Sequence, residues 1–271
     1  MDLFSPGDFC PCGSGKKIID CCGRGEFGKF FVGCPKYDES SILKDIIENS
    51  HEFENFYLKE RGKIKKYIVW RGVINKNELT PGIGGNSKIN PESGLSIITL
   101  KNFPPKIRDA ILIAHEMEHI ILSFEKFPSV PCHNGYEKIP RLLSSMIEDV
   151  VVDERLSNYG FDVTDSYLKE FKESKRQLSS VHRVPTDPEV VIQYTFQYAG
   201  LLLAFNRLFD KSYSKPSFFL FFDIRFSSIA TDAKNLTQII EEKGYDTPEK
   251  AKEIYNFIIT RYNLNGKMWV S

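Results

Sequence analysis

Four cysteines fall within thirteen positions near the start of this chain, and two of them are adjacent. The surrounding segment, residues 5–24, is rich in Gly, Ser and Cys and has too few apolar side chains to form a core. Something other than hydrophobic burial must therefore hold it together. Four thiolates on two short arms can surround one tetrahedral Zn²⁺, and metal binding supplies the folding free energy that this composition lacks. The pattern is C-x-C-x8-C-C, formed by Cys10, Cys12, Cys21 and Cys22.

Other interpretations of the cysteines are weaker. Disulfides form in secreted proteins, but a single metal suits four such closely spaced thiols better than two bridges do. A set of free or oxidised thiols is the remaining alternative. Cys34 and Cys132 lie outside the pattern, and each is expected to be a small packed residue or an ordinary loop thiol rather than a ligand.

The cysteines belong to a specific run, Cys10-Pro11-Cys12-Gly13-Ser14-Gly15-Lys16-Lys17, which Cys21-Cys22 follows. These residues resemble the SEC-C motif, which is found in the tail of a protein-translocation ATPase and as an appendage on many bacterial and archaeal proteins. The resemblance covers about twenty residues. It implies a structural zinc knuckle, here residues 1–30, that docks onto a partner protein.

A second metal-binding pattern lies near the middle of the chain, in the run His115-Glu116-Met117-Glu118-His119. Histidines four residues apart project from the same face of a helix, and the glutamate after the first can reach a water on the metal. Two neutral histidines and one carboxylate can hold a catalytic Zn²⁺ that keeps an open coordination position. The metal would polarise the water and a substrate carbonyl, while Glu116 acts as the general base.

The surrounding sequence favours a catalytic site over an ordinary pair of core histidines. A helix is predicted from Pro104-Pro105 to about Phe124, and it is strongly apolar on both sides of the motif. Two histidines and two glutamates would be costly to bury there without a metal. The strand-like residues 95–100 precede this helix directly, in a way similar to the cleft-edge strand that pairs with a peptide substrate in zincin folds.

A third ligand is expected from a second predicted helix, residues 139–159. Helical spacing puts Asp149 and Asp153 on its inward face together with apolar residues, and buried acids need partners. We select Asp149 as the third zinc ligand, with Asp153 as a hydrogen-bond acceptor for a ligating histidine. Glu148, which points nearly opposite, is the alternative ligand, and a salt bridge to an arginine of the same helix is the alternative role for the aspartates.

This helix pair resembles the gluzincin and aspzincin metallopeptidases over roughly residues 95–156. Many of these use Glu as the third ligand, which keeps Glu148 as an alternative. The metzincin extension is absent, because Leu122 stands where that family has Gly. Zincins often stabilise the oxyanion with a His or Tyr, so His133 and His182 are candidates, although a surface histidine is the simpler interpretation of each.

The whole chain predicts an α+β fold, in which the small zinc knuckle is followed by a zincin-like, mostly helical domain with a small sheet over residues 31–271. β-branched and aromatic residues predict strands, and apolar residues at helical spacing predict further helices. The predicted strands are 67–74 and 95–100 with a turn around 81–86, and the further helices are 41–56, 188–209, 231–243 and 248–262.

Charge and hydropathy limit the choice of function. The chain has 36 basic residues (Lys and Arg) and 36 acidic residues (Asp and Glu), so no net positive field favours nucleic-acid binding. The longest apolar stretches, residues 198–205 and 218–222, are too short for membrane insertion, and residues 1–9 lack the features of a signal peptide. We therefore expect a cytoplasmic protein.

The sequence thus predicts a zinc-dependent metallopeptidase that acts on peptides or proteins, with one catalytic and one structural Zn²⁺. Glu116 is the predicted catalytic residue, and His115, His119 and Asp149 are the predicted ligands of the catalytic metal. Two other functions stay open. One is a non-catalytic adaptor whose histidine helix holds a structural or vestigial metal, and the other is a zinc hydrolase that acts on a small amide.

Overall fold

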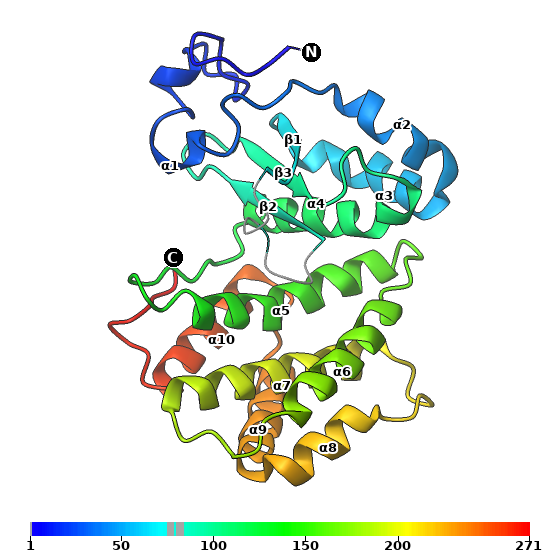
Figure 1. The fold of residues 1–271 in the computed structure, drawn as a ribbon, viewed down its shortest axis with the longest axis vertical. Coiled ribbons are helices and arrows are strands. Elements are labelled where there is room, and N and C mark those ends of the chain that lie inside the picture. Colours follow the sequence, from blue (N-terminus) through cyan, green and yellow to red (C-terminus); the bar gives the residue numbers. More distant parts are fainter. Residues whose placement is uncertain (1, 75–78, 80–83) are drawn as a thin grey trace. The chain divides into compact units, whose positions relative to one another are not determined.

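The computed structural model describes residues 2–74, 79 and 84–271, which form a mostly helical chain with a small sheet. The chain divides into two compact units, Met1–Glu125 and Lys126–Ser271. The described strands form one three-stranded sheet, which agrees with the predicted α+β class. The cysteine-rich segment and the helix with the two histidines both belong to the first unit (Figure 1).

The first unit combines the cysteine-rich segment, the sheet and the helices that pack on that sheet (Figure 1). Helix α4 packs against strands β2 and β3, and α3 packs against α4. The elements in chain order are η1 (Ile18–Asp20), α1 (Gly25–Gly28), α2 (Glu39–Asn49), α3 (His51–Glu60), η2 (Arg61–Lys63), β1 (Ile68–Gly72), β2 (Gly85–Ile89), β3 (Ser96–Leu100), η3 (Ile107–Asp109) and α4 (Ala110–Phe124).

The central strand of the sheet is β3, because the strand order is β1-β3-β2. β1 pairs with it in parallel and β2 pairs with it antiparallel. All five residues of β3 are buried. The interpretation of residues 95–100 as a cleft-edge strand is therefore wrong, because neighbouring strands occupy both edges of β3. The edge strand beside the histidine helix is β2.

Strand β2 falls where the sequence predicts a turn around residues 81–86. Residues 81–83 lie outside the described residues, while Gly85 and Asn86 are the first two residues of β2. The sequence from Gly85 to Lys88 has low intrinsic strand propensity, so only its pairing with β3 makes it a strand. The strand that borders the candidate catalytic helix is therefore not predictable from its local sequence.

The helix predicted over residues 41–56 is two helices, α2 and α3, which are separated at Ser50. The backbone of Ser50 is extended, with φ −125° and ψ 107°, so the first helix stops there. Its hydroxyl accepts a hydrogen bond from the Phe53 N–H at 3.3 Å and caps the second helix. Apolar spacing continues across this break, which is why periodicity alone predicts one helix.

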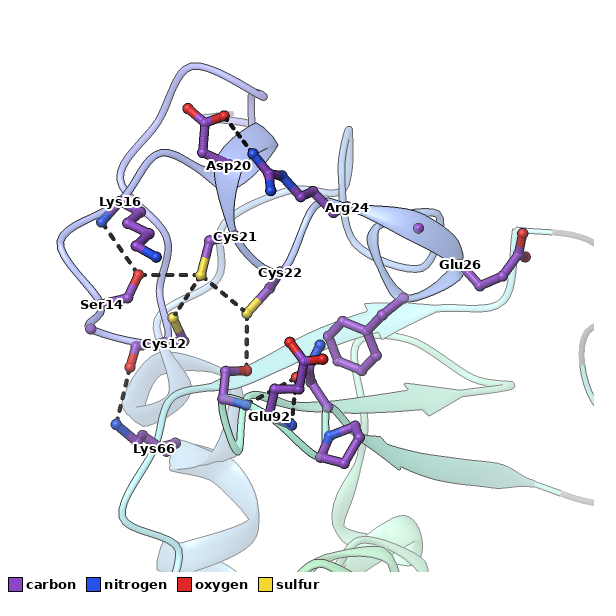
Figure 2. A pocket seen from close by; sticks show the side chains of 16 residues that line it. Cys12, Ser14, Lys16, Asp20, Cys21, Cys22, Arg24, Glu26, Lys66 and Glu92 are labelled. Atoms are coloured by element: carbon purple, nitrogen blue, oxygen red, sulfur yellow. Dashed lines mark hydrogen bonds and ion pairs between the residues drawn. The ribbon is translucent and has the colours of Figure 1, made fainter. Parts of the chain in front are cut away.

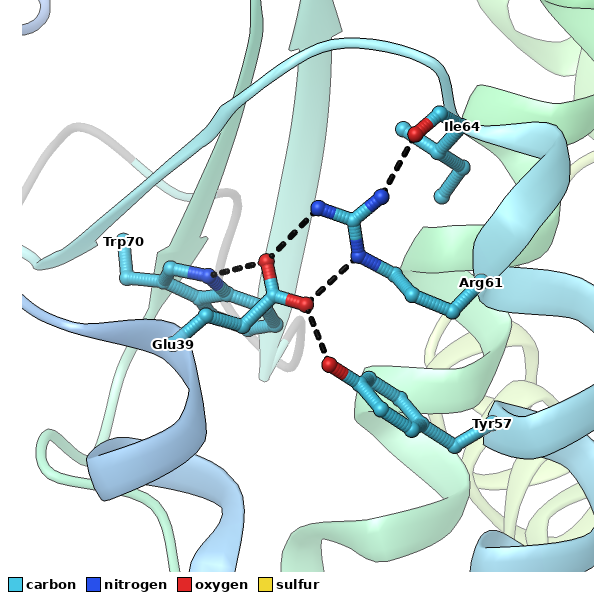
Figure 3. Close-up of polar contacts among 5 residues, drawn as sticks. All are labelled: Glu39, Tyr57, Arg61, Ile64 and Trp70. Carbon is cyan, nitrogen blue, oxygen red and sulfur yellow. Dashed lines mark hydrogen bonds and ion pairs between the residues drawn. The ribbon is translucent and has the colours of Figure 1, made fainter.

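A half-buried polar network joins α2, α3, η2 and β1 (Figure 3). The Glu39 carboxylate accepts hydrogen bonds from Arg61 Nε at 2.5 Å, Arg61 Nη2 at 3.0 Å and Tyr57 Oη at 2.6 Å. Trp70 Nε1 donates to the same carboxylate at 3.4 Å, and Arg61 Nη1 donates to the Ile64 carbonyl at 2.5 Å. The Glu39 side chain is only 14% exposed, so one desolvated carboxylate of α2 binds residues of the three other elements.

Replacing Glu39 with glutamine is expected to lower the free energy of unfolding by roughly 3 kcal/mol, because Arg61 would keep a poorly solvated charge without its counter-ion. Glu48→Gln on the same helix is the matched control. Its side chain is 60% exposed and 3.9 Å from Lys44, so a change within about 0.5 kcal/mol is expected. Urea denaturation of the two variants measures both values, and equal values would contradict the role of the network.

The second unit is built around α7, which packs against α5, α6 and α9. The helices predicted over 139–159, 188–209, 231–243 and 248–262 are confirmed with small differences at their ends, while α6 and α8 are additional. No described helix combines the length and the hydropathy that a bilayer crossing requires. The elements are α5 (Lys138–Ser157), α6 (Thr164–Ser179), α7 (Pro188–Leu208), α8 (Ser217–Arg225), α9 (Ser227–Lys243) and α10 (Pro248–Arg261).

Candidate metal centres

The four predicted cysteine ligands lie together at one point of the first unit, as a shared metal requires. The sulfur atoms of Cys10, Cys12, Cys21 and Cys22 are all within 4.8 Å of one another. Cys21 Sγ is 3.5 Å from Cys12 Sγ and 3.8 Å from Cys22 Sγ, and all are free thiols. Two thiolates on one tetrahedral zinc, each at about 2.3 Å, lie about 3.8 Å apart. The spacing of the sulfurs therefore fits a zinc ion.

Tight backbone turns place the two pairs of cysteines. Gly13 and Gly15 have φ values of 79° and 72°, in the left-handed region that favours glycine. The Cys10 N–H donates to the Lys16 carbonyl at 2.8 Å and closes the loop that carries the first pair. The second pair follows η1, at whose end the Cys21 N–H donates to the Ile18 carbonyl at 3.0 Å. The glycines in the motif thus serve the ligand geometry.

The cysteine thiols differ in how readily they ionise. Burial raises the pKa of Cys10 and of Cys22. Burial acts in the same direction on Cys12, but hydrogen bonds from Ser14, Cys10 and Cys21 outweigh it and lower the pKa of Cys12 to about 6. Because a metal binds thiolates, it must displace protons from the buried thiols, and metal affinity therefore falls as the pH falls.

A pocket of about 830 Å³ opens beside the cysteines, between the cysteine-rich segment and the turn that joins β2 to β3 (Figure 2). In the thiol form, Cys22 Sγ donates to Ser93 Oγ at 3.0 Å. Lys66 Nζ donates to the Cys12 carbonyl at 3.2 Å. Neither Ser93 nor Lys66 is predicted from the sequence, because Ser93 is 71 residues from Cys22 and no local pattern links them.

The two predicted histidine ligands also lie together, on one face of α4. The Nε2 atoms of His115 and His119 are 3.1 Å apart, and their ring centroids are 4.7 Å apart. Two imidazole nitrogens on one tetrahedral zinc, each at about 2.0–2.1 Å, lie about 3.3 Å apart. Both side chains are half-buried, and the two Nε2 atoms are within hydrogen-bond distance of each other. The histidine pair therefore fits two ligands of one zinc ion.

Glu116 follows His115 on a helix that is otherwise almost entirely apolar. Ile113, Met117 and Ile120 of this helix have no exposed surface, and Glu116 is only 6% exposed. The other glutamate of the motif, Glu118, is among the carboxylates whose charges raise the pKa of Lys63 against the effect of burial. Burying a carboxylate among apolar side chains costs free energy unless a partner stabilises it. The buried position of Glu116 is therefore consistent with a chemical role.

The predicted third ligand, Asp149, lies on α5 in the second unit, with Asp153 one turn further along. Tyr167 of α6 donates from Oη to Asp153 Oδ2 at 2.7 Å. Burial raises the pKa of Tyr167, and the charges of Asp153 and Asp149 raise it further. Desolvation and the same two charges raise the pKa of Glu170 to about 7. Because Glu170 is exposed, we attribute the raised pKa to repulsion from the two aspartates more than to desolvation. This repulsion indicates a local excess of negative charge.

The alternative ligand, Glu148, has a different environment on the same helix. Its Oε1 accepts a hydrogen bond from Tyr255 Oη of α10 at 3.0 Å. Tyr255 has no exposed surface, and its pKa is raised by burial and by the charge of Glu148. Glu148 therefore satisfies a buried hydroxyl inside the second unit, which gives it a structural role.

The remaining predicted candidates lie at the surface or in the core. His133 is exposed and its ring centroid lies 5.3 Å from that of Trp269. His182 is exposed in the segment between α6 and α7. Cys34 is buried and its thiol donates to the Phe30 carbonyl at 3.6 Å, so its prediction as a packed residue is confirmed. An oxyanion role for either histidine stays a prediction.

Two groups of residues able to bind metal are therefore present in the first unit, a four-cysteine cluster and a pair of histidines followed by a buried glutamate. The spacing within each group fits zinc. No protein-family model, curated protein or solved structure matches this chain, so its function has to be inferred from these residues.

Proposed function

We propose that this protein is a zinc-dependent metallopeptidase with a zincin-like catalytic region. The observation that carries the proposal is the 3.1 Å separation of His115 Nε2 and His119 Nε2 on a buried apolar helix, with Glu116 beside the first of them. Two convergent imidazoles and an adjacent carboxylate are the parts that water-activating zinc sites need.

The residues of the chain divide the chemistry between them. Zinc, when bound, supplies the Lewis acidity that polarises the water and the scissile carbonyl. His115 and His119 would hold it through their Nε2 atoms. Glu116 takes a proton from the attacking water and later gives it to the leaving amine, so the peptide bond is cleaved with no net change in the enzyme.

We propose Asp149 as the third ligand. Asp149 and Asp153 lie in a region of excess negative charge on α5, where a cation would be stabilised. Tyr167 orients the neighbouring Asp153 by a 2.7 Å hydrogen bond. This contact supports the proposed role of Asp153 as a hydrogen-bond acceptor for a ligating histidine. The hydrogen bond that Glu148 accepts from Tyr255 also supports Asp149 as the ligand, because it gives Glu148 a structural role within the second unit.

Peptides are the proposed substrates. Among the described strands, β2 pairs with β3 alone, and α4 packs against β2. An extended peptide can add to the outer edge of such a strand through main-chain hydrogen bonds. A peptide bound at the outer edge of β2 would lie along the strand nearest the histidine helix. It could not bind to β3 in this way, because both edges of β3 are already paired. The four cysteines hold a structural zinc, and the knuckle around it is proposed to dock onto a protein partner.

Metal analysis combined with a cleavage assay tests the proposal. The purified full chain should contain about two zinc ions, and metal-replete protein should cleave members of a peptide pool with loss of activity on chelation. Mass spectrometry of the pool measures cleavage directly. Zinc at the cysteines alone with no cleaved peptide would instead support the adaptor function.

A further inference from the structure

The cysteine-rich segment and its flanking residues, taken together as residues 2–34, share one hydrophobic core with the sheet. Phe4, Ile18, Phe31 and the buried cysteines form one cluster with the strand residues Val69 and Ile97 and with Leu95, which precedes β3. The ring centroids of Phe4 and Tyr67 lie 6.3 Å apart in an edge-to-face arrangement. An independently folded domain has a hydrophobic core of its own. This segment instead needs residues of the sheet to complete its core.

Polar contacts cross the same boundary. Arg71 of β1 is 2% exposed, and its Nη1 donates to the Phe30 carbonyl at 2.8 Å. Lys88 of β2 places its Nζ 3.5 Å from the centroid of the Phe30 ring. The Lys66 hydrogen bond to the Cys12 carbonyl joins the residues just before β1 to the first cysteine pair. The segment is therefore tied to both edge strands of the sheet.

Ser93 makes the contact that reaches the cysteine cluster itself. Its Oγ lies 3.0 Å from Cys22 Sγ and accepts a hydrogen bond from the Leu95 N–H at 3.2 Å. Leu95 directly precedes β3. When Cys22 is a thiolate it can only accept, so the Ser93 hydroxyl donates to the sulfur while it continues to accept from Leu95. A continuous hydrogen-bonded chain then runs from a metal ligand to the start of the central strand.

We propose that the turn between β2 and β3 is part of the structural zinc site, with Ser93 as a positioning residue, and that zinc binding at the cysteines is coupled to the folding of the sheet and of α4. This inference rests on the proposed zinc at Cys10, Cys12, Cys21 and Cys22. Hydrogen bonds to metal-bound thiolates orient the ligands and offset their charge, so their loss weakens metal binding. Because β2 and β3 pack against α4, the effect reaches the histidine helix through the sheet.

Zinc release from full-length His119→Ala protein tests the role of Ser93. That variant should keep only the cysteine-bound zinc, so release to a chromogenic chelator reports on one site. Adding Ser93→Ala is expected to weaken zinc binding roughly 10–100-fold, while Ser93→Thr, which keeps the hydroxyl, should restore most of it. Ser87→Ala on β2 is the matched control and should have no effect. Equal zinc affinity in the Ser93→Ala and Ser87→Ala variants would overturn the proposed role of the turn.

Hydrogen exchange of the same protein before and after chelation tests the coupling. Loss of zinc should expose the amides of β1, β3 and α4 together with those of the cysteine-rich segment, while residues 126–271 keep their protection. If protection is lost only in roughly the first 30 residues, the segment is an independent appendage and the coupling is wrong. If His119→Ala protein binds no zinc, the proposed structural zinc fails first and the inference falls with it.

Discussion

Replacing Glu116 with glutamine is expected to reduce peptide hydrolysis roughly 10²–10⁴-fold while the protein keeps both zinc ions. The amide is nearly the same size as the carboxylate but cannot accept the proton of the attacking water. Glu116 is 6% exposed on a helix whose other buried residues, apart from Glu118, are apolar, so the substitution removes a carboxylate from apolar surroundings and should not destabilise the fold. Initial rates on a cleaved peptide, with zinc content per chain, measure the effect.

Glu125→Gln is a suitable control for this experiment. Glu125 directly follows α4, and its side chain is 32% exposed and 3.7 Å from Lys63 Nζ. It carries the same charge near the same helix without a place in the proposed chemistry, so its activity should equal that of the unmodified protein. Full activity of Glu116→Gln would rule out the general-base role, whereas loss of zinc together with activity would give Glu116 a structural role instead.

Ligands that are close together in the sequence could be predicted from their spacing. His115 and His119 converge because a helix brings positions four apart onto one face. The cysteine pairs converge because glycine turns and η1 fix the backbone within a few residues of each sulfur. In both cases local geometry determines the arrangement, so the sequence contains the information that is needed.

Helix boundaries could be predicted where a capping residue marks them. Asp187 accepts hydrogen bonds from two N–H groups of the first turn of α7, and Thr247 accepts one from α10, each just before a proline. Helix α6 carries a usable signal that the predictions leave out, because its buried residues recur at helical spacing. They are Tyr167, Phe171, Ser174 and Leu178.

Contacts between residues far apart in the chain could not be predicted. Ser93 meets Cys22 across 71 residues, and Arg61 meets Glu39 across 22. Strand β2 depends on its pairing with β3, because its own residues favour a turn. The helical angles of α5 place Glu148 away from the aspartates, but they carry no information on its partner Tyr255, which lies 107 residues later. Such pairings are decided by the tertiary packing of each unit.

Removing a ligand of the proposed catalytic zinc should lower the zinc content from about two ions per chain to about one. His119→Ala is the reference, because one of two converging imidazoles is lost. Asp149→Asn is expected to give the same loss, since a neutral amide is a poor zinc ligand of nearly the same shape as the carboxylate. Plasma mass spectrometry of protein freed of loosely bound metal gives the zinc content.

Glu148→Gln separates the two possible third ligands, because it changes the neighbouring residue of α5 in the same way. The amide oxygen can still accept the hydrogen bond that Tyr255 Oη donates to Glu148 at 3.0 Å, so the second unit should stay folded and both zinc ions should remain. If Glu148→Gln loses one zinc while Asp149→Asn keeps two, the assignment is reversed. If both variants keep two zinc ions, neither Asp149 nor Glu148 is the third ligand. The excess negative charge around Asp149 and Asp153 would then serve another purpose.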